Sequence, residues 1–367
     1  MFENKIISSQ TPLAKTSLAN FRASIKNKKI KTFLLVNRNG LELCFTNHGL
    51  RVISLLTPDK NNNFDDVVLG FNSIEDYKTK EGKYFGSIVG QYANRIKNGS
   101  FYYDKKEYHL DKNEGKNHIH GGQLGFNDIV WNVIQINNKS IEFQSFFSDG
   151  QNGYPGNLDV RVTYTLTDQN EFKIDYKATT DKTTIINLSH HSYFNLKGEG
   201  RGSVKDHILT INADYFTPTT DEMIPDGTIK SVLDSPFDFR EPKIIAENML
   251  IKSNQIEKAK GFDHNYVIKQ SIKNTDGLTF AARVFEKISG RVLEVYTSEP
   301  GVQFYTGNFL SGSLIGKSNE YYYPYAGFCL ETQHYPNSPN VPEFPSTFLH
   351  PNETYNSTTV YKFSTIK

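Results

Sequence analysis

Apolar and polar residues alternate with a period of two along much of this chain from Lys31 onward. In the stretch LDVRVTYTL, Val160 and Val162 alternate with Arg161 and Thr163. Because successive side chains of a β-strand point to opposite faces, this pattern predicts strands with one buried face. Polar turns separate such stretches in pairs, which predicts three antiparallel hairpins: residues 32–36 with 41–45, 131–136 with 141–147, and 158–166 with 172–176.

Helical segments are expected to be few. Aromatic residues make up 13% of the chain, with 26 Phe and 21 Tyr, and aromatics suit pleated surfaces better than helices. We expect helices only over residues 11–25 and 241–256, the second with Pro242 in its first turn. No repeat or low-complexity linker marks a domain boundary. The sequence therefore predicts an all-β fold: a large single-domain antiparallel β sandwich over residues 31–367, preceded by an N-terminal extension of residues 1–30.

Charge and hydropathy exclude several classes of protein. Lys and Arg number 41 against 40 Asp and Glu, and no dense basic block could follow a phosphate backbone, so we expect no nucleic-acid partner. No run of about 18 apolar residues could cross a bilayer. The N-terminal residues lack an apolar secretory signal, which indicates a cytoplasmic protein. Cys44 and Cys329 lie in apolar strand-like stretches and are expected to be buried, reduced thiols.

Polar residues cluster in six short segments that otherwise look like strand ends or loops. Each segment places one or two hydrogen-bonding residues among aromatics or glycines, a mixture that suits a sugar pocket with hydroxyls to bind and a flat ring to cover. Singly, none of the six is specific. They are GQYANRI from Gly90, HIHGG from His118, SHHSYFNL from Ser189, GFDHNY from Gly261, GVQFYTGN from Gly301 and CLETQ from Cys329.

Taken in this order, the six segments resemble the aldose 1-epimerase (galactose mutarotase) family. The resemblance runs from about Leu43 to Phe363 and includes the linking phrases DDVVLGF, DGQNGYPGNLDV and TGNFL. It implies a single large antiparallel β sandwich, which agrees with the periodicity. It also implies an enzyme that interconverts the α and β anomers of a free aldose sugar such as galactose or glucose without a cofactor, as a monomer or homodimer.

The resemblance assigns roles to individual residues. Glu331 in CLETQ matches the family's base at the C1 hydroxyl, and His191 in HHSYFNL matches its acid at the ring oxygen. Tyr193 and Phe304 are expected to line the pocket. The residues expected to hold the sugar hydroxyls are Asn94, Arg95, His120, Asp263 and Gln303, with Arg95 and His120 donating and Asp263 accepting.

The chemistry explains why such residues are needed. Opening a pyranose requires one group to remove the proton of the C1 hydroxyl while another delivers a proton to the ring oxygen. One base and one acid suffice, and each contributes roughly 10²- to 10⁴-fold. Free Glu has a pKa of about 4.3 and free His one of about 6.5, so near neutrality one is ionised and the other is partly protonated.

Two other functions remain open at this stage. A metal-dependent β-sandwich enzyme of the cupin type could use His118, His120, His191 and Glu331, because two spaced histidines with a later Glu and His can bind a divalent ion. A non-catalytic sugar-binding protein is the second alternative, but it would have no need of an acid and base pair. The glycines after His120 break the strand alternation, so we expect His120 to face the pocket and His118 to point elsewhere.

The sequence departs from the family pattern at three positions. Gln91 stands where the family often has Arg in the phrase GRxANRI, and His48 and His190 stand where Tyr and Asn are common. None of these departures removes a proposed catalytic group. We expect Gln91 to support the segment with Asn94 and Arg95 without a direct part in proton transfer.

Overall fold

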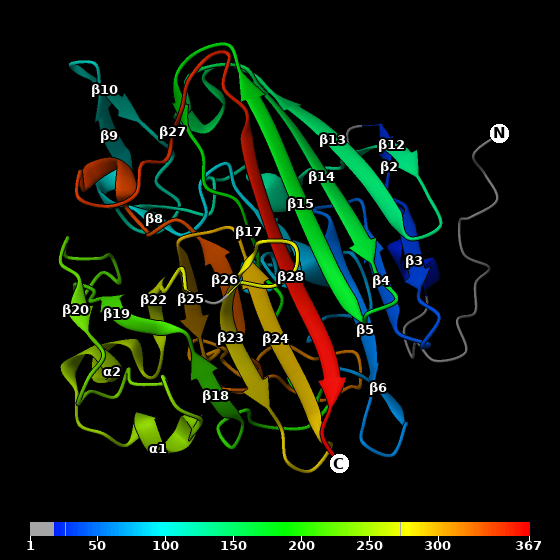
Figure 1. Ribbon diagram of the computed structural model, residues 1–367. Coiled ribbons are helices and arrows are strands. Elements are labelled where there is room, and N and C mark those ends of the chain that lie inside the picture. Colours follow the sequence, from blue (N-terminus) through cyan, green and yellow to red (C-terminus); the bar gives the residue numbers. More distant parts are fainter. Residues whose placement is uncertain (1–17, 26, 272) are drawn as a thin grey trace.

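The computed structural model describes residues 18–25, 27–271 and 273–367 (Figure 1). Its largest element is a nine-stranded sheet in which every pair of neighbouring strands is antiparallel. In spatial order, its strands are β12 (Asn132–Ile136), β13 (Ser140–Phe147), β14 (Leu158–Leu166), β15 (Glu171–Thr180), β28 (Tyr355–Thr365), β24 (Arg291–Thr297), β23 (Thr279–Phe285), β18 (Ile208–Ile211) and β21 (Lys243–Ile244). The C-terminal strand β28 thus lies in the middle of the sheet, between β15 and β24 (Figure 1).

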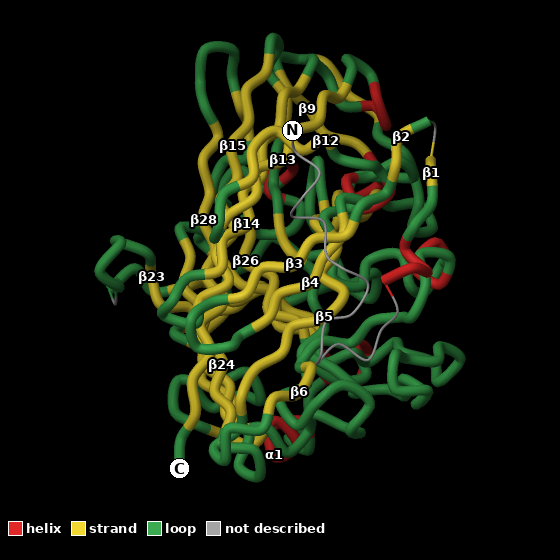
Figure 2. The backbone as a smooth tube through the Cα atoms, turned by 90° about the vertical axis from the view of Figure 1, so that its right-hand side faces the viewer, coloured by secondary structure: helices red, strands yellow, loops and turns green. Residues whose placement is uncertain are grey.

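Two smaller antiparallel sheets lie against this one. The first contains β3 (Thr32–Val36), β4 (Glu42–Thr46), β5 (Arg51–Pro58) and β6 (Phe64–Asp66). The second has the order β20 (Lys230–Ser231), β19 (Ala213–Thr217), β22 (Asp263–Ile268), β25 (Gly301–Tyr305) and β26 (Cys329–Gln333). Figure 2 shows the large sheet along one side of the molecule, the β3–β6 sheet beside it, and longer loops on the other side.

Short strands and helices complete the described chain. Five two-stranded pairs are β1 (Ser24–Ile25) with β2 (Lys28–Lys29), β7 (Ile88–Val89) with β17 (Ser189–His190), β8 (Arg95–Ile96) with β11 (His118–Ile119), β9 (Ser100–Tyr103) with β10 (Lys106–His109), and β16 (Thr184–Ile185) with β27 (Phe348–Leu349). The α-helices are α1 (Ile245–Met249) and α2 (Asn254–Ala259). Single 3₁₀ turns occur at Leu18–Phe21, Asp76–Lys78, Lys97–Gly99, Phe126–Asp128, Gln151–Gly153 and Ser338–Asn340.

The hydrophobic core lies between the sheets. Along β14 the buried and partly exposed positions alternate, so that Val160, Val162 and Tyr164 face inward. They join one buried cluster with Leu43 of the β3–β6 sheet and Phe304 of the five-stranded sheet. Residues from all three sheets therefore share one core, which confirms the predicted sandwich.

All three predicted hairpins are present. Residues 32–36 pair with β4, residues 132–136 pair with β13, and residues 158–166 pair with β15. The predicted buried thiols are also found, because Cys44 and Cys329 are buried and free. In the part of the chain that the structure describes, the longest helix has only six residues, and none could cross a membrane.

The helix predictions were less accurate. The single helix predicted over residues 241–256 is wrong: Lys243–Ile244 pairs with β18 at the sheet edge, and two short helices follow. The Ser253 side chain accepts a hydrogen bond from the Gln255 N–H and so caps the start of α2, which separates it from α1.

The other predicted helix, over residues 11–25, lies partly outside the described residues, which begin at residue 18. Within them, residues 18–21 form one 3₁₀ turn and residues 24–25 form a strand, so the helix is not continued there. Phe21 is fully buried and its ring lies 6.1 Å from that of Tyr77. The boundary of an N-terminal extension at residue 30 stays a prediction.

Candidate active site

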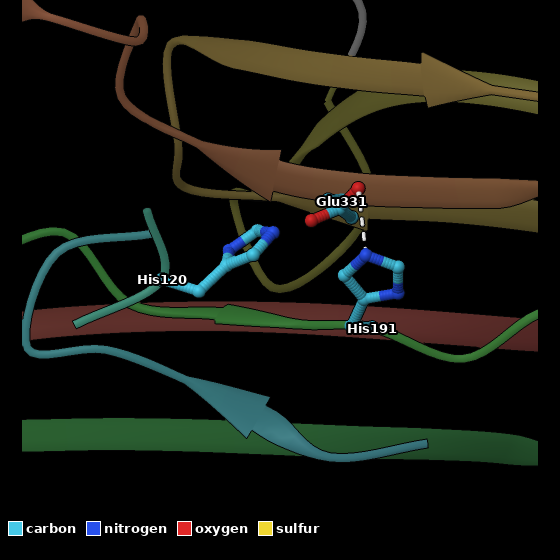
Figure 3. A group of neighbouring side chains, drawn as sticks. All are labelled: His120, His191 and Glu331. Carbon is cyan, nitrogen blue, oxygen red and sulfur yellow. Dashed lines mark ion pairs between the residues drawn. The ribbon is translucent and has the colours of Figure 1, made fainter. Parts of the chain in front are cut away.

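Three side chains predicted to act on the sugar meet in one buried cluster. Glu331 lies on β26, His191 directly follows β17, and His120 directly follows β11. Figure 3 shows the three side chains pointing toward one another from these separate elements. His191 Nε2 lies 3.7 Å from Glu331 Oε1, and the two histidine rings are 5.3 Å apart. The structure thus brings together residues that are up to 211 positions apart in the chain (331 minus 120).

The register of the five-stranded sheet explains why further polar residues share this face. Asn265 of β22, Gln303 of β25 and Glu331 of β26 lie directly opposite one another. Because side chains alternate across a strand, Asp263 projects from the same face of β22 as Asn265. The expected sugar-binding residues Asp263 and Gln303 therefore lie beside the expected base.

A network of charges holds Arg95 at the edge of this face. The Arg95 guanidinium donates two hydrogen bonds to Glu114, from Nε to Oε2 at 2.6 Å and from Nη2 to Oε1 at 2.8 Å. Its Nη1 lies 3.7 Å from Asp263 Oδ2. Gln303 Nε2 donates to the other oxygen of Asp263 at 2.7 Å. The bidentate pair with Glu114 fixes the orientation of the guanidinium, and the Gln303 amide in turn orients the Asp263 carboxylate that faces it.

Hydrogen bonding determines which nitrogen of His120 carries a proton. The backbone N–H of Asn94 donates to His120 Nδ1 at 3.1 Å, so Nδ1 is an acceptor. Burial, with His191 and Arg95 nearby, holds the pKa of His120 well below its usual value, so the ring is neutral. In a neutral ring with Nδ1 accepting, the proton lies on Nε2. His120 therefore presents a donor toward Glu331 and His191.

Burial shifts the pKa values of the acid and base in opposite directions. The pKa of Glu331 is raised well above its ordinary value, first by burial and then by the charge of Asp263, which Arg95 only partly offsets. Burial lowers the pKa of His191 to about 4. Both shifts favour the uncharged forms, as expected for groups removed from water. In the free protein burial therefore favours a proton on Glu331 over one on His191.

A cleft of about 820 Å³ leads to the cluster. Arg95, Tyr193 and Tyr305 line it, and each contacts the buried group: Arg95 through Asp263, Tyr193 through His191, and Tyr305 as the strand neighbour of Asp263. Two buried oxygens of the cluster, Glu331 Oε2 and Gln303 Oε1, have no hydrogen-bond partner among the described residues. Buried polar atoms without partners are rare in folded proteins and mark places where a ligand or water binds.

Comparisons with known proteins agree with this architecture. The sequence profile of the family described as aldose 1-epimerase matches residues 31–362. This chain belongs to the aldose 1-epimerase family. Galactose mutarotase of Rattus norvegicus is 46% identical over 316 residues, which cover 86% of this chain and 89% of that protein. Aldose 1-epimerase of Escherichia coli is 38% identical over 331 residues, which cover 90% of this chain and 94% of that protein.

Solved structures of aldose 1-epimerase relatives have the same fold. The crystal structure of an aldose epimerase homologue from C. elegans matches with a TM-score of 0.82 at 32% identity, covering 92% of this chain and all of that one (100%). Galactose 1-epimerase from Lactobacillus acidophilus matches with a TM-score of 0.81 at 28% identity, covering 94% and 97% of the two chains. The predicted fold class is thereby confirmed.

One expected lining residue of the epimerase pocket points the other way. Phe304 is fully buried among core aromatics, with its ring 5.2 Å from Phe262 and 5.9 Å from Phe239. It alternates with Gln303 along β25, so the two side chains must lie on opposite faces. The prediction that Phe304 lines the pocket is wrong, and Tyr305, on the face of Asp263, takes that place.

Two neighbours of the cluster were missed in the sequence. Glu114, which pairs with Arg95, lies outside the six segments and has no local motif. Tyr84 lies just before Phe85, and its ring is 4.6 Å from that of His120 and 6.1 Å from that of His191. Neither residue has a sequence signal of its own, whereas strand alternation could have distinguished Tyr305, which was also missed, from Phe304.

The three departures from the family pattern all lie in buried surroundings. The Gln91 amide donates to the Thr184 hydroxyl at 2.9 Å and to the Ile185 carbonyl at 2.8 Å, so it joins its own segment to β16. The His190 ring contacts Ser192 and Tyr164. His48 Nδ1 accepts from the buried guanidinium of Arg51 at 3.1 Å. None of these side chains has a contact with Glu331 among those described.

The histidines fit a metal site poorly. His118 donates from Nδ1 to the Asp111 carbonyl at 2.7 Å and contacts the Tyr154 hydroxyl through Nε2 at 2.5 Å, so both of its nitrogens are occupied. As expected, it does not join His120. The atoms of His120, His191 and Glu331 do lie within 4.8 Å of one another. A histidine that ligates a metal donates its other N–H to an acceptor, whereas His120 Nδ1 faces the N–H donor of Asn94.

Proposed function

We propose that this protein is an aldose 1-epimerase that interconverts the α and β anomers of free aldohexoses such as galactose and glucose by acid and base catalysis, without a cofactor. The observation that carries the proposal is the buried pair of Glu331 and His191, whose facing atoms lie 3.7 Å apart. Such a pair can remove one proton and deliver another to atoms that are close together on one sugar ring.

The proton balance of the reaction needs only this pair. Glu331 takes the proton from the C1 hydroxyl, the C1–O1 bond becomes a carbonyl, and the bond between C1 and the ring oxygen breaks. His191 Nε2 delivers its proton to the ring oxygen as the bond breaks. After rotation about C1–C2, the same transfers run backward and close the ring on the other face. No electrons enter or leave the sugar.

The direction of the pKa shifts supports this exchange. The products of ring opening are a protonated Glu331 and a neutral His191, and burial favours both forms. The reverse closure requires the carboxyl proton to return to the sugar and His191 to regain its own. When sugar is bound, its C1 hydroxyl donates a hydrogen bond to Glu331, and this interaction favours the ionised carboxylate. The pair thus holds one exchangeable proton throughout.

The surrounding groups suit a polyhydroxylated ring. We assign the binding of sugar hydroxyls to Arg95 and His120 as donors, to Asp263 as an acceptor, and to Gln303 and Asn94 as amides. Gln303 retains an unpartnered buried oxygen, which can accept from a hydroxyl. Tyr193 supplies an aromatic wall, since its ring lies 5.0 Å from His191 and lines the cleft.

Polarimetry of the purified protein tests the proposal. Freshly dissolved α-galactose and α-glucose should approach their equilibrium rotation faster in proportion to the protein added. Sugar binding without any acceleration would identify a non-catalytic sugar-binding protein, and the proposed function would then be wrong.

Chelation separates the proposed chemistry from a metal-dependent reaction. Because His120 Nδ1 and both nitrogens of His118 are already engaged, we expect dialysis against EDTA to leave kcat unchanged. The rate should be compared before and after dialysis, and again after Zn²⁺ is added back. Loss of turnover on dialysis with recovery on Zn²⁺ addition would favour the cupin-type site.

A further inference from the structure

Strand β26 presents a second side chain to His191 besides Glu331. Cys329 and Glu331 are two residues apart on this strand and project from the same face. Cys329 Sγ lies 3.6 Å from His191 Nδ1, while Glu331 Oε1 lies 3.7 Å from His191 Nε2. One strand therefore contacts both nitrogens of the imidazole, and all three side chains are buried.

We propose that Cys329 is a positioning residue for the reaction: its sulfur accepts from His191 Nδ1 and so reserves Nε2 for proton exchange with the ring oxygen of the sugar. The inference rests on the proposed function. An imidazolium that gives up its Nε2 proton leaves a neutral ring with the proton on Nδ1. The Nδ1–H group thus persists through ring opening and closure, and Cys329 is the side chain it faces.

The choice of sulfur has a chemical consequence. A carboxylate beside Nδ1 would orient the ring equally well, but it would also stabilise the imidazolium. Burial keeps the thiol protonated by raising its pKa well above the ordinary value, and the negative charge of Asp263, with that of Glu331 whenever it is ionised, adds to this. A neutral thiol is a weak acceptor. It orients His191 while leaving it a strong acid, which suits the weakly basic ring oxygen.

Several ionisable groups face the same imidazole. Glu331 and Cys329 approach from β26, His120 from the turn after β11, Tyr84 from the loop before β7, and Tyr193 from the segment after His191 itself. Of these, Cys329 is the side chain in hydrogen-bond contact with Nδ1 among the described residues, and the ring also has a hydrogen bond to the backbone of His191 itself. The tautomer of His191 is therefore the property that Cys329 is best placed to control.

Nitrogen NMR reads this tautomer directly. The full-length protein would be labelled with ¹⁵N-histidine, and the His191 signals among the ten histidines would be assigned by their loss in His191→Asn. At pH 7 without sugar, we expect wild-type His191 to carry its proton on Nδ1. In Cys329→Ala we expect a shift toward the Nε2–H form, and in Cys329→Ser a return to Nδ1–H, since a hydroxyl oxygen also accepts.

Cys44→Ala is the matched control. Cys44 is the other buried, free thiol and belongs to the same hydrophobic cluster as Cys329, so this variant loses the same sulfur from the same core without losing a hydrogen bond to His191. It should leave the His191 tautomer unchanged. An Nε2–H form in the wild type, the same tautomer in Cys329→Ala as in the wild type, or an equal change in Cys44→Ala would each overturn the proposal.

The pH profile of kcat gives a second readout, which loss of packing alone would not shift. Cys329→Ala should lower kcat by about tenfold to a hundredfold, the range found when a group that orients a metal-ligating histidine is removed. Cys329→Ser should recover most of kcat and move the acid limb of the kcat profile upward, because a hydroxyl stabilises the imidazolium better than a thiol. Identical pH profiles in the wild type, Cys329→Ala and Cys329→Ser would contradict the inference. A wild type with the Nδ1–H tautomer but no mutarotase activity would instead refute the proposed function alone.

Discussion

Arg95 illustrates how single residues are held in this site. Its guanidinium is fixed by Glu114 on one side and approaches Asp263 on the other. A buried polar group left without its partner costs about 1 to 3 kcal/mol. We therefore expect Arg95→Ala and Asp263→Ala each to lower kcat/KM for galactose by roughly tenfold to a hundredfold, measured by polarimetry.

Two variants calibrate this prediction. Glu114→Gln keeps a hydrogen-bond acceptor for Arg95 but removes its charge, so its effect on kcat/KM should be smaller than that of Arg95→Ala. Arg38 forms an ion pair with Asp168 at the surface, and the Arg38 side chain is 86% exposed. Arg38→Ala should therefore leave kcat/KM unchanged. Wild-type kcat/KM in both Arg95→Ala and Asp263→Ala would place the sugar elsewhere.

At the scale of residues, the sequence predicted the motif-bearing side chains and missed those that meet them in space. Glu331, His191 and His120 each lie in a recognisable segment, and the structure brings them together. Glu114 lies in a turn without a motif, and its pairing with Arg95 arises only when β11 returns to β8. Phe304 was assigned to the wrong face, although alternation along its own strand already separates it from Gln303.

At the scale of elements, predictability followed strand length. The hairpins of β3–β4, β12–β13 and β14–β15 have enough residues for a period of two to be recognised. The pairs that carry the histidines, β7–β17 and β8–β11, have two residues per strand and show no period. The β7 and β17 partners are also about 100 residues apart, so their pairing depends on tertiary packing.

The turn after β11 provides a test at this scale. Gly121 has a φ of +89°, and an added Cβ would lie 1.7 Å from the Gly90 carbonyl oxygen. Gly121→Ala should therefore displace His120, lower kcat strongly, and reduce stability by more than the roughly 1 kcal/mol that a positive φ alone costs. Rates and thermal unfolding of the purified variant measure both effects.

Gly277→Ala is the control for this turn. Gly277 lies away from the cleft and also has a positive φ, +77°, but nothing lies within 4 Å of an added Cβ. This variant should show only the small loss of stability and keep its rate. Equal behaviour of the two variants would mean that the close approach of Gly121 to Gly90 does not hold His120 in place.

At the scale of the whole molecule, the sequence predicted one sandwich but not its order of strands. Alternation shows that a strand has a buried face, yet it does not tell which strand lies beside it. The C-terminal strand β28 inserts between β15 and β24, and this joins the two halves of the large sheet. The large hydrophobic core that results also encloses many polar groups.

Buried histidines make the stability of the whole fold depend on pH. Burial lowers the pKa of seven histidines. For His48, His190 and His264 it falls to about 3, for His118 and His191 to about 4, and for His120 and His207 it also lies below the ordinary value. The unfolded chain binds protons at these residues below about pH 6.5, whereas the folded chain does not. Burial of these rings therefore carries no protonation cost above pH 6.5, and the folded state loses stability progressively as the pH falls from 6.5 toward 3.

We therefore expect the unfolding temperature to fall as the pH is lowered from 7.5 to 5, which scanning calorimetry can measure. For each net proton taken up on unfolding, the free energy of unfolding falls by about 1.4 kcal/mol for every unit by which the pH is lowered. The raised pKa values of Glu331 and Asp263 act in the opposite sense, so the slope should be less than that of seven protons. An unfolding temperature that stays constant or rises over this range would contradict these pKa shifts.

The central claim concerns the acid and base pair, and initial mutarotation rates of pair variants test it most directly. Glu331→Gln and His191→Asn should each lower kcat for α-galactose by at least about 10²-fold, and the double variant should lose much less than the product of the two losses. Glu299, which is buried, and His334, which is partly buried, form another Glu and His contact at 2.6 Å, away from the cleft, so Glu299→Gln and His334→Asn should stay within about threefold of wild type. A near wild-type kcat in Glu331→Gln or His191→Asn would contradict the account.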